Sequence, residues 1–184
     1  MPEPRRPGQV IFLHGASSSG KSTIARALMM RIDAPFMHIS IDHFRDDGAL
    51  PWSRFSSGEF DWATCRDRFF DGFHRALGAF CQSGNNLILE HILDSDAFLS
   101  ALTHALQGVD VFTVGVHCPA DVLAKREAAR GDRRLGSAQE DQLTIHKGHS
   151  YDLDVDGTRP VDHILAVWRR RKPPLAFARG FRPV

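Results

Sequence analysis

Apolar runs alternate with amphipathic stretches along most of the chain. The strand-like runs predict five strands, over residues 10–13, 35–41, 87–90, 109–117 and 152–156. Apolar positions at helical spacing predict helices over residues 22–28, 62–81, 94–107, 119–129 and 161–171. Strands that alternate with helices indicate the α/β class, with a five-stranded parallel sheet and helices on both faces. We therefore expect three layers, with ligands bound at the carboxyl ends of the strands.

An aromatic segment interrupts this alternation at residues 44–62, where glycine, proline and serine are interleaved with Phe44, Trp52, Phe55, Phe60 and Trp62. The segment either packs as a helical insert on the core or lines a pocket for a small, partly apolar substrate. Both interpretations stay open, and they are compatible. The predicted helix that follows carries its apolar face on Phe69, Phe73, Leu77 and Phe80.

The composition is that of a globular protein of 184 residues, long enough for one well-packed domain. A net charge of +1 favours neither a nucleic-acid nor an acidic membrane partner, and we expect neither. The short polar N-terminus lacks the apolar centre of a signal peptide, so we expect a cytoplasmic protein. We expect a single domain over residues 1–184, with loose tails at 1–8 and 173–184. The three widely spaced cysteines are expected to be buried reduced thiols.

A phosphate-binding motif lies between the first predicted strand and helix. The motif G-x-x-x-x-G-K-S consists of Gly15, Ala16, Ser17, Ser18, Ser19, Gly20, Lys21 and Ser22. The next residue, Thr23, is also expected to contact the nucleotide. In such a loop, backbone N–H groups and the helix N-terminus bind a nucleotide's β-phosphate. Lys21 then reaches the β- and γ-phosphates, and the Ser22 hydroxyl ligates Mg²⁺. A serine-rich turn that merely joins strand to helix would not require the lysine.

Two carboxylates are expected at the same edge of the sheet. Asp42 follows the second strand and is a candidate general base for a substrate hydroxyl, although Asp also commonly caps a turn. Glu90 ends the third strand as a Walker B acid does, and it is a candidate Mg²⁺ ligand or a structural carboxylate. His91 and Asp94 follow on the same rim.

An arginine cluster lies at the end of the fourth predicted helix. Its members are Arg126, Arg130, Arg133 and Arg134, and the first two share one helix face. P-loop kinases place such arginines in a lid that closes over ATP and neutralises charge on the transferred phosphoryl group. The alternative is a solvated basic surface. With the lid, the prediction is a three-layer P-loop NTPase fold with an arginine-bearing lid.

The chain resembles the chloramphenicol phosphotransferases and their P-loop kinase relatives over roughly residues 9–170. The stretches that carry the resemblance are residues 11–22, 39–42, 114–118, 126–133, 146–148 and 151–156, of which R-E-x-A-R-G-D-R and Y-D-x-x-V-D are the narrower signals. The resemblance implies ATP-dependent phosphorylation of a hydroxyl, with Asp42 as general base. It also implies that Arg126, Arg130 and Arg133 serve the lid and the phosphates.

The chain departs from that family where the acceptor should bind. Glu90-His91 stands at the end of the third strand in place of two aspartates, and residues 45–62 show no match. The leading interpretation is an ATP- and Mg²⁺-dependent kinase of a small-molecule alcohol, such as chloramphenicol or another natural product, with antibiotic resistance as one role. A metabolic or nucleoside kinase, and a protein that sequesters ATP and ligand without fast transfer, are the alternatives. The pattern predicts no oligomeric state.

Overall fold

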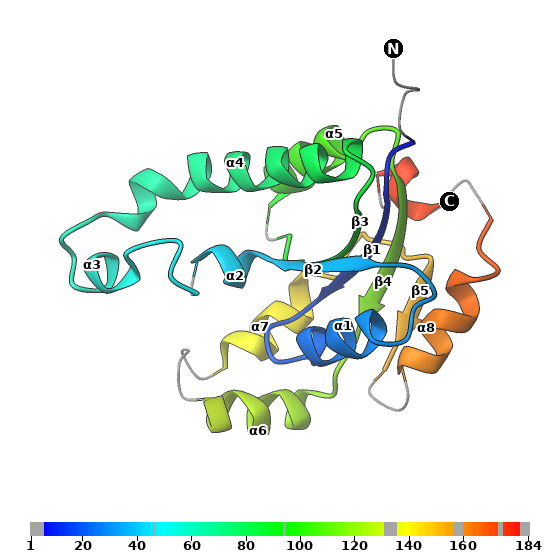
Figure 1. Cartoon of the computed structure of the whole chain (residues 1–184). Coiled ribbons are helices and arrows are strands. Elements are labelled where there is room, and N and C mark those ends of the chain that lie inside the picture. The colour runs from blue at the N-terminus through cyan, green and yellow to red at the C-terminus, as the bar shows by residue number, and fades with distance from the viewer. Residues whose placement is uncertain are drawn as a thin grey trace, which may run out of the picture.

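A computed structural model describes residues 6–45, 47–93, 95–130, 136–156, 160–172 and 175–180 of the chain. Five strands form one parallel sheet in the order β2-β3-β1-β4-β5 (Figure 1). Their bounds are β1 Gln9–Gly15, β2 Phe36–Ser40, β3 Asn86–His91, β4 Asp110–Val116 and β5 Leu153–Val155. The predicted five-stranded parallel sheet is confirmed.

Side chains of the central strand β1 alternate between two cores. Val10 and Phe12 pack into a cluster with helices α4 Trp62–Gln82 and α5 Asp96–Ala105, whereas Ile11 and Leu13 face α1 Lys21–Met29 and α8 Pro160–Trp168. The strand is buried on both faces, which explains why it is apolar throughout rather than alternating. Figure 1 shows the two helical layers on opposite faces of the sheet.

Helix α4 buries a face shifted by one residue from the predicted one. Phe70, His74 and Cys81 are buried with Phe73 and Leu77. Phe69 and Phe80, which we expected in the core, are only partly buried at its edge. The contact with α5 sets this rotation, because Gly78 lies so close to Ala105 that a Cβ there would be 2.6 Å from its carbonyl oxygen.

The aromatic segment forms two short helices, α2 Ile41–Arg45 and α3 Trp52–Ser56. Helix α3 lies at the far end of α4 from the sheet (Figure 1), and none of its residues is buried. Its rings pack on one another instead, with centroids 5.3 Å apart for Trp52–Trp62 and 5.8 Å apart for Trp52–Phe55. A helical insert on the core is therefore the wrong interpretation for α3. Phe44 of α2 does reach the core, where it meets Phe73.

Two further segments differ from the prediction. Helix α7 Ser137–Thr144, which follows α6 Ala120–Arg130, was not expected. The supposedly loose C-terminal tail forms the 3-10 helix η1 Ala176–Arg179, and Leu175, Ala176 and Phe177 are buried. At the other end, Gly8 is also buried and its N–H donates to the carbonyl of Cys81. Across the described ranges, no helix is long and apolar enough to span a membrane.

Candidate active site

The phosphate-binding loop joins the end of β1 at Gly15 to the start of α1 at Lys21. Gly20 has a φ of +101°, a left-handed conformation that strains residues with a Cβ. At Gly15 a Cβ would lie 2.4 Å from the backbone oxygen of Val116, so the strand could not keep its place beside β4. The two glycines of the motif are thus required by backbone conformation and close approach.

Lys21 is buried inside this loop. Its Nζ donates to the carbonyl oxygens of Gly15 at 2.9 Å and Ala16 at 2.7 Å, and the residue is only 8% exposed. The hydroxyls of Ser18 and Ser19 are buried and have no hydrogen-bond partner among the described residues. A buried cation and unsatisfied hydroxyl donors fit an anion such as a nucleotide phosphate, because such a ligand would satisfy them.

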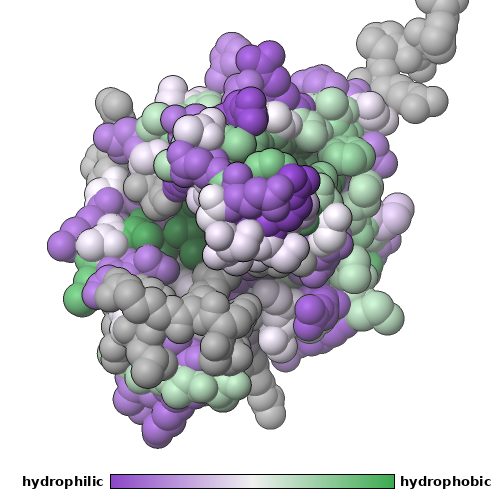
Figure 2. Space-filling view, turned by 90° about the vertical axis from the view of Figure 1, so that its left-hand side faces the viewer, coloured by the Kyte–Doolittle hydropathy of each residue, from purple (hydrophilic) through white to green (hydrophobic). Residues whose placement is uncertain are grey.

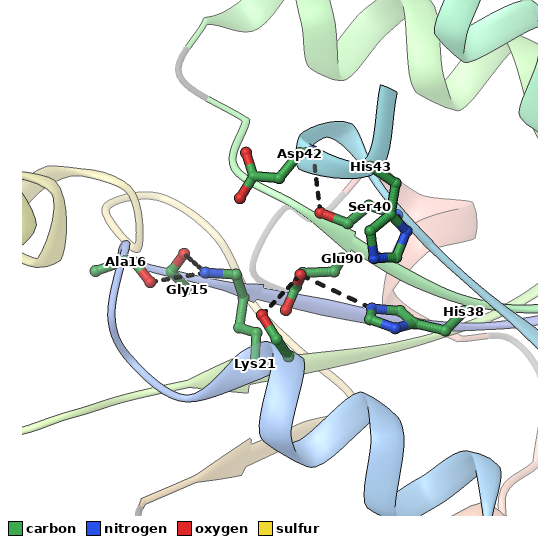
Figure 3. Close-up of polar contacts among 9 residues, drawn as sticks. Gly15, Ala16, Lys21, His38, Ser40, Asp42, His43 and Glu90 are labelled. Atoms are coloured by element: carbon green, nitrogen blue, oxygen red, sulfur yellow. Dashed lines mark hydrogen bonds and ion pairs between the residues drawn. The ribbon is translucent and has the colours of Figure 1, made fainter. Parts of the chain in front are cut away.

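Glu90 lies beside Ser22, at the carboxyl end of β3. Ser22 Oγ donates to Glu90 Oε1 at 3.1 Å, and His38 Nε2 lies 3.8 Å from the same oxygen (Figure 3). Burial alone raises the pKa of Glu90, but His38, Lys21 and Ser22 outweigh it and hold the pKa below its usual value. Glu90 Oε2 is buried and accepts no hydrogen bond from the described residues. An ionised carboxylate oxygen beside a serine hydroxyl fits a hard cation such as Mg²⁺.

Asp42 lies in the first turn of α2, two residues beyond the end of β2. Its backbone N–H donates to Ser40 Oγ at 3.2 Å, and its Oδ1 accepts from Arg45 Nη2 at 2.8 Å. In Figure 3 the carboxylate points away from Ser40 toward the side where Lys21 lies. Asp42 and the phosphate-binding loop therefore face the same space, as expected from their positions at the carboxyl edge.

One cavity of about 880 Å³ brings these residues together. Its lining includes residues 17–24 of the loop and α1, the carboxylates Asp42 and Glu90, and Arg126 of α6. Figure 2 looks onto the α3 end of the molecule and shows a hollow with an apolar floor and a hydrophilic rim. A larger groove, of about 1380 Å³, lies between α5 and η1, away from the phosphate-binding loop. Most residues proposed from sequence line the smaller cavity or lie outside the described side chains, whereas Gly15 and Ala16 at the start of the loop do not line it.

Arg126 projects from α6 onto the phosphate-binding loop, where its Nη1 donates to Ser18 O at 3.3 Å. The next residue, Glu127, is buried and accepts the N–H groups of Gly136 at 2.5 Å and Ala138 at 2.9 Å, which fixes the start of α7. The sequence did not predict this contact, because Glu127 meets Gly136 and Ala138 only once the chain has folded. Three of the predicted residues lie outside the described ranges: Asp94, Arg133 and Arg134. For Arg130 only the backbone is described.

The cavity residues that the sequence did not predict include two arginines from α2 and α4. Arg45 and Arg66 line the cavity together with Phe70. Arg45 carried a usable signal, because it stands three residues after Asp42 in the segment for which substrate binding was one of two open interpretations. Arg66 carried none, since an arginine in an amphipathic helix is usually on the solvated face.

A chain of hydrogen bonds runs through His14, the residue of β1 just before the phosphate-binding loop. Leu93 N–H donates to His14 Nε2 at 3.3 Å, so the His14 proton is on Nδ1, which donates to Tyr151 Oη at 2.8 Å. The Tyr151 hydroxyl then donates to His146 Nδ1, also at 2.8 Å. Burial is the main cause that lowers the pKa of His14 and brings that of His146 to about 4, so both imidazoles are neutral near pH 7. The network ties β1 to the segment after α7.

Comparisons with known sequences identify the family of the chain. The family model for chloramphenicol phosphotransferase-like proteins matches residues 8–170. Proposed O-phosphotransferases from two strains of Mycobacterium tuberculosis are 28% identical over 192 residues, covering 90% of this chain and 80% of their own length.

Solved structures with a similar fold are P-loop kinases. The APS kinase CysC of Mycobacterium tuberculosis, solved with AMPPNP and APS, has a TM-score of 0.63 at 15% identity and covers 89% of this chain and 96% of its own. The shikimate kinase of Acinetobacter baumannii, solved with shikimate, has a TM-score of 0.60 at 13% identity, with coverages of 91% and 97%. At these identities the likeness shows the fold alone. By the family match, the chain belongs to the chloramphenicol phosphotransferase-like family and is a phosphotransferase.

Proposed function

We propose that the protein transfers the γ-phosphate of ATP to a hydroxyl group of a small molecule. The observation that carries the proposal is the shared cavity, in which a buried loop lysine, a carboxylate on the neighbouring strand end and an arginine from α6 meet. These are Lys21, Asp42 and Arg126. Catalysis of phosphoryl transfer is mostly positioning and charge stabilisation, and these three side chains are suited to both.

The loop binds the nucleotide. Its backbone N–H groups and the N-terminus of α1 hold the phosphates, and the Ser18 and Ser19 hydroxyls are available to add hydrogen bonds. Lys21 exchanges two neutral carbonyl acceptors for phosphate oxygens, which form stronger charge-assisted hydrogen bonds. Arg126, already at the loop, reaches the same phosphates.

Ser22 and Glu90 would hold Mg²⁺. The ion supplies charge neutralisation on the β- and γ-phosphates when it is bound. The low pKa of Glu90 keeps its carboxylate ionised at neutral pH, so no proton has to leave before a cation binds.

Asp42 acts as general base. Its carboxylate, oriented by Arg45, accepts the proton of the acceptor hydroxyl as that oxygen bonds to the γ-phosphorus and the bond from phosphorus to the leaving ADP oxygen breaks. Arg126, with Arg130 and Arg133 from the resemblance, stabilises the charge on the transferred group. The products are ADP, a phosphorylated alcohol and one proton.

The acceptor is a small alcohol, and chloramphenicol or another natural product is the candidate that the family name supplies. The experiment incubates the protein with ATP, Mg²⁺ and a mixture of alcohols that includes chloramphenicol, sugars and nucleosides, and searches for phosphate adducts by mass spectrometry. An adduct of chloramphenicol or a related compound indicates resistance as the role, whereas an adduct of a sugar or nucleoside indicates a metabolic kinase. Binding of ATP with no adduct and no ADP formed would contradict the proposal.

A further inference from the structure

The register of β2 and β3 brings a histidine to Glu90, the carboxylate proposed to hold Mg²⁺. Ser40 pairs with Glu90 in this register, and His38 pairs with Ile88. Side chains two positions apart on a strand point to the same face of the sheet, so His38 lies on the face of Glu90. Ile88, on that face, packs against α1, the helix that carries Ser22. One face of the sheet therefore carries the imidazole, the carboxylate and the serine helix.

The imidazole of His38 is buried beside Glu90. Each of the two side chains is 7% exposed, and His38 Nε2 lies 3.8 Å from Glu90 Oε1 (Figure 3). This distance is longer than a hydrogen bond, so the contact is an electrostatic approach between two groups that face each other. A carboxylate oxygen only accepts hydrogen bonds, so His38 can support it only with a proton on Nε2.

Two buried polar atoms at this contact have no hydrogen-bond partner among the described residues. They are His38 Nε2 and Glu90 Oε2. Unpaired polar atoms are costly inside a protein, so each needs a reason for its place. A cation on Oε2 would complete the carboxylate, while Oε1 stays on the side of His38 and Ser22. The two oxygens of Glu90 thus have separate tasks, one toward the metal and one toward the protein.

The ring of His38 is held by a second imidazole. His43 of α2 packs on it in a T-shaped contact with centroids 4.7 Å apart. His43 is itself oriented, because its Nδ1 accepts the backbone N–H of Ser40 at 3.3 Å. The Ser40 hydroxyl in turn accepts the N–H of Asp42 at 3.2 Å. The imidazole pair therefore connects Glu90 to the turn that carries the proposed base.

The electrostatics of Glu90 agree with this geometry. Burial raises the pKa of Glu90, and His38 is the largest of the influences that lower it, ahead of Lys21 and Ser22. His38 is not among the residues that line the cavity, so it does not touch the nucleotide or the acceptor there. Its effect on the reaction has to pass through Glu90.

Building on the Mg²⁺ site of the proposed function, we propose that His38 is a positioning residue for the metal. Its Nε2–H holds Oε1 of Glu90, so that Oε2 is presented to the cation. A residue that supports a metal-ligating carboxylate fixes the direction of that ligand, and loss of such a residue weakens metal binding by about 10–100-fold.

The test compares wild-type protein with His38→Phe, His38→Gln and a control, His104→Phe. Phenylalanine keeps a ring against His43 but has no donor, whereas the glutamine amide can place an N–H near the position of Nε2. His104 is exposed on α5, away from the phosphate-binding loop. If His38→Phe does not fold, His38→Leu takes its place as the variant without a donor.

Each protein is titrated with Mg²⁺ at saturating AMPPNP, and thermal unfolding reports how much cation the nucleotide complex needs. AMPPNP binding is also measured in EDTA. We expect His38→Phe to raise the Mg²⁺ concentration for half-maximal stabilisation by about 10-fold or more, with metal-free AMPPNP binding unchanged. His38→Gln and His104→Phe should stay close to wild type. A merely structural role would not be rescued by glutamine in this way.

The inference is overturned, and the proposed function kept, if His38→Phe needs no more Mg²⁺ than wild type or if His38→Gln needs as much as His38→Phe. Because the titration does not depend on turnover, it decides the role of His38 even where no acceptor is phosphorylated and the proposed transfer fails. Wild-type protein that AMPPNP does not stabilise at any Mg²⁺ concentration overturns both, since no nucleotide-bound metal exists for His38 to position.

Discussion

Glu90 combines burial with a lowered pKa because His38, Lys21 and Ser22 favour its ionised form. Ser22 donates to Oε1 and His38 lies near it, while Lys21 adds its charge. The carboxylate is thereby ionised next to a hydroxyl that would share the same Mg²⁺. Glu90 is the residue at which the metal proposal is most easily separated from the nucleotide proposal.

Glu90→Gln should raise the Mg²⁺ concentration needed for half-maximal transfer by about 10-fold or more. The amide keeps the size of the side chain but removes the negative charge that attracts the cation. Titrating Mg²⁺ at saturating ATP measures the effect, with Glu59→Gln, an exposed glutamate paired with Arg54, as control. An unchanged Mg²⁺ dependence in Glu90→Gln would leave Glu90 as a structural carboxylate.

Residues in the phosphate-binding loop could be predicted because their chemistry depends on neighbours in sequence. Gly15, Lys21 and Ser22 lie within eight positions, and the loop conformation follows from that spacing. Arg66 could not be predicted, because its place in the cavity depends on how α4 is rotated against α5. The close contact between Gly78 and Ala105 belongs to this arrangement, and the hydrophobic pattern of α4 alone does not predict it.

At the scale of elements, α4 and β3 meet at a buried pair of imidazoles. His74 Nε2 and His91 Nε2 are 3.0 Å apart, and both residues are 1% exposed. Burial is the main cause that lowers the pKa of His74 to about 4 and that of His91 to about 3. In the unfolded chain both would titrate near about 6.5. Below that pH the unfolded state binds more protons than the folded state, so the free energy of unfolding falls as pH decreases.

His74→Leu should therefore make the loss of stability on acidification shallower, by about 1–3 kcal/mol between pH 7 and 4. Leucine also packs among the apolar rings of this contact without a charge to accommodate. Urea unfolding at several pH values provides the measurement, and His163→Leu, at an exposed position of α8, serves as control. A pH dependence identical to that of wild type would show that the buried pair does not set acid stability.

The strands and the long helix α4 were predicted closely, whereas the short helices α3 and α7 were not. Helix α4 was expected over residues 62–81 and extends over Trp62–Gln82, because its apolar period covers many turns. Helix α7 is amphipathic only weakly, and its start depends on Glu127 of α6 rather than on a local cap. Helix α3 has few sequence signals because its rings pack on their neighbours within the segment instead of on the core.

In the whole molecule, the C-terminal segment packs on the face of the sheet that α4 and α5 cover. The N–H of Ala176 donates to Asp152 Oδ1 at 2.7 Å, while Asp152 Oδ2 accepts from the backbone and hydroxyl of Thr113. Phe177 is 4% exposed and meets the Phe12 ring with centroids 6.5 Å apart. The sequence did not predict this packing, because Pro173 and Pro174 precede the segment and only a few apolar residues follow them.

Phe177→Ala should lower the free energy of unfolding by about 3–5 kcal/mol, the usual range for removing a buried phenylalanine. Chemical denaturation measures the change. Leu143→Ala, at a position 69% exposed, should stay within about 0.5 kcal/mol of wild type. If Phe177→Ala unfolds like Leu143→Ala, the segment contributes nothing to the core and the loose tail expected from sequence is restored.

In the proposed reaction, one cavity binds ATP at the loop and activates an acceptor hydroxyl at Asp42. Its most direct test measures ATP affinity and phosphate transfer in the same preparations of wild type and Asp42→Asn, with the acceptor mixture present. We expect unchanged ATP affinity and a loss of transfer of about 100-fold or more, because asparagine keeps the shape but cannot take the proton. Transfer by Asp42→Asn at close to the wild-type rate would contradict it.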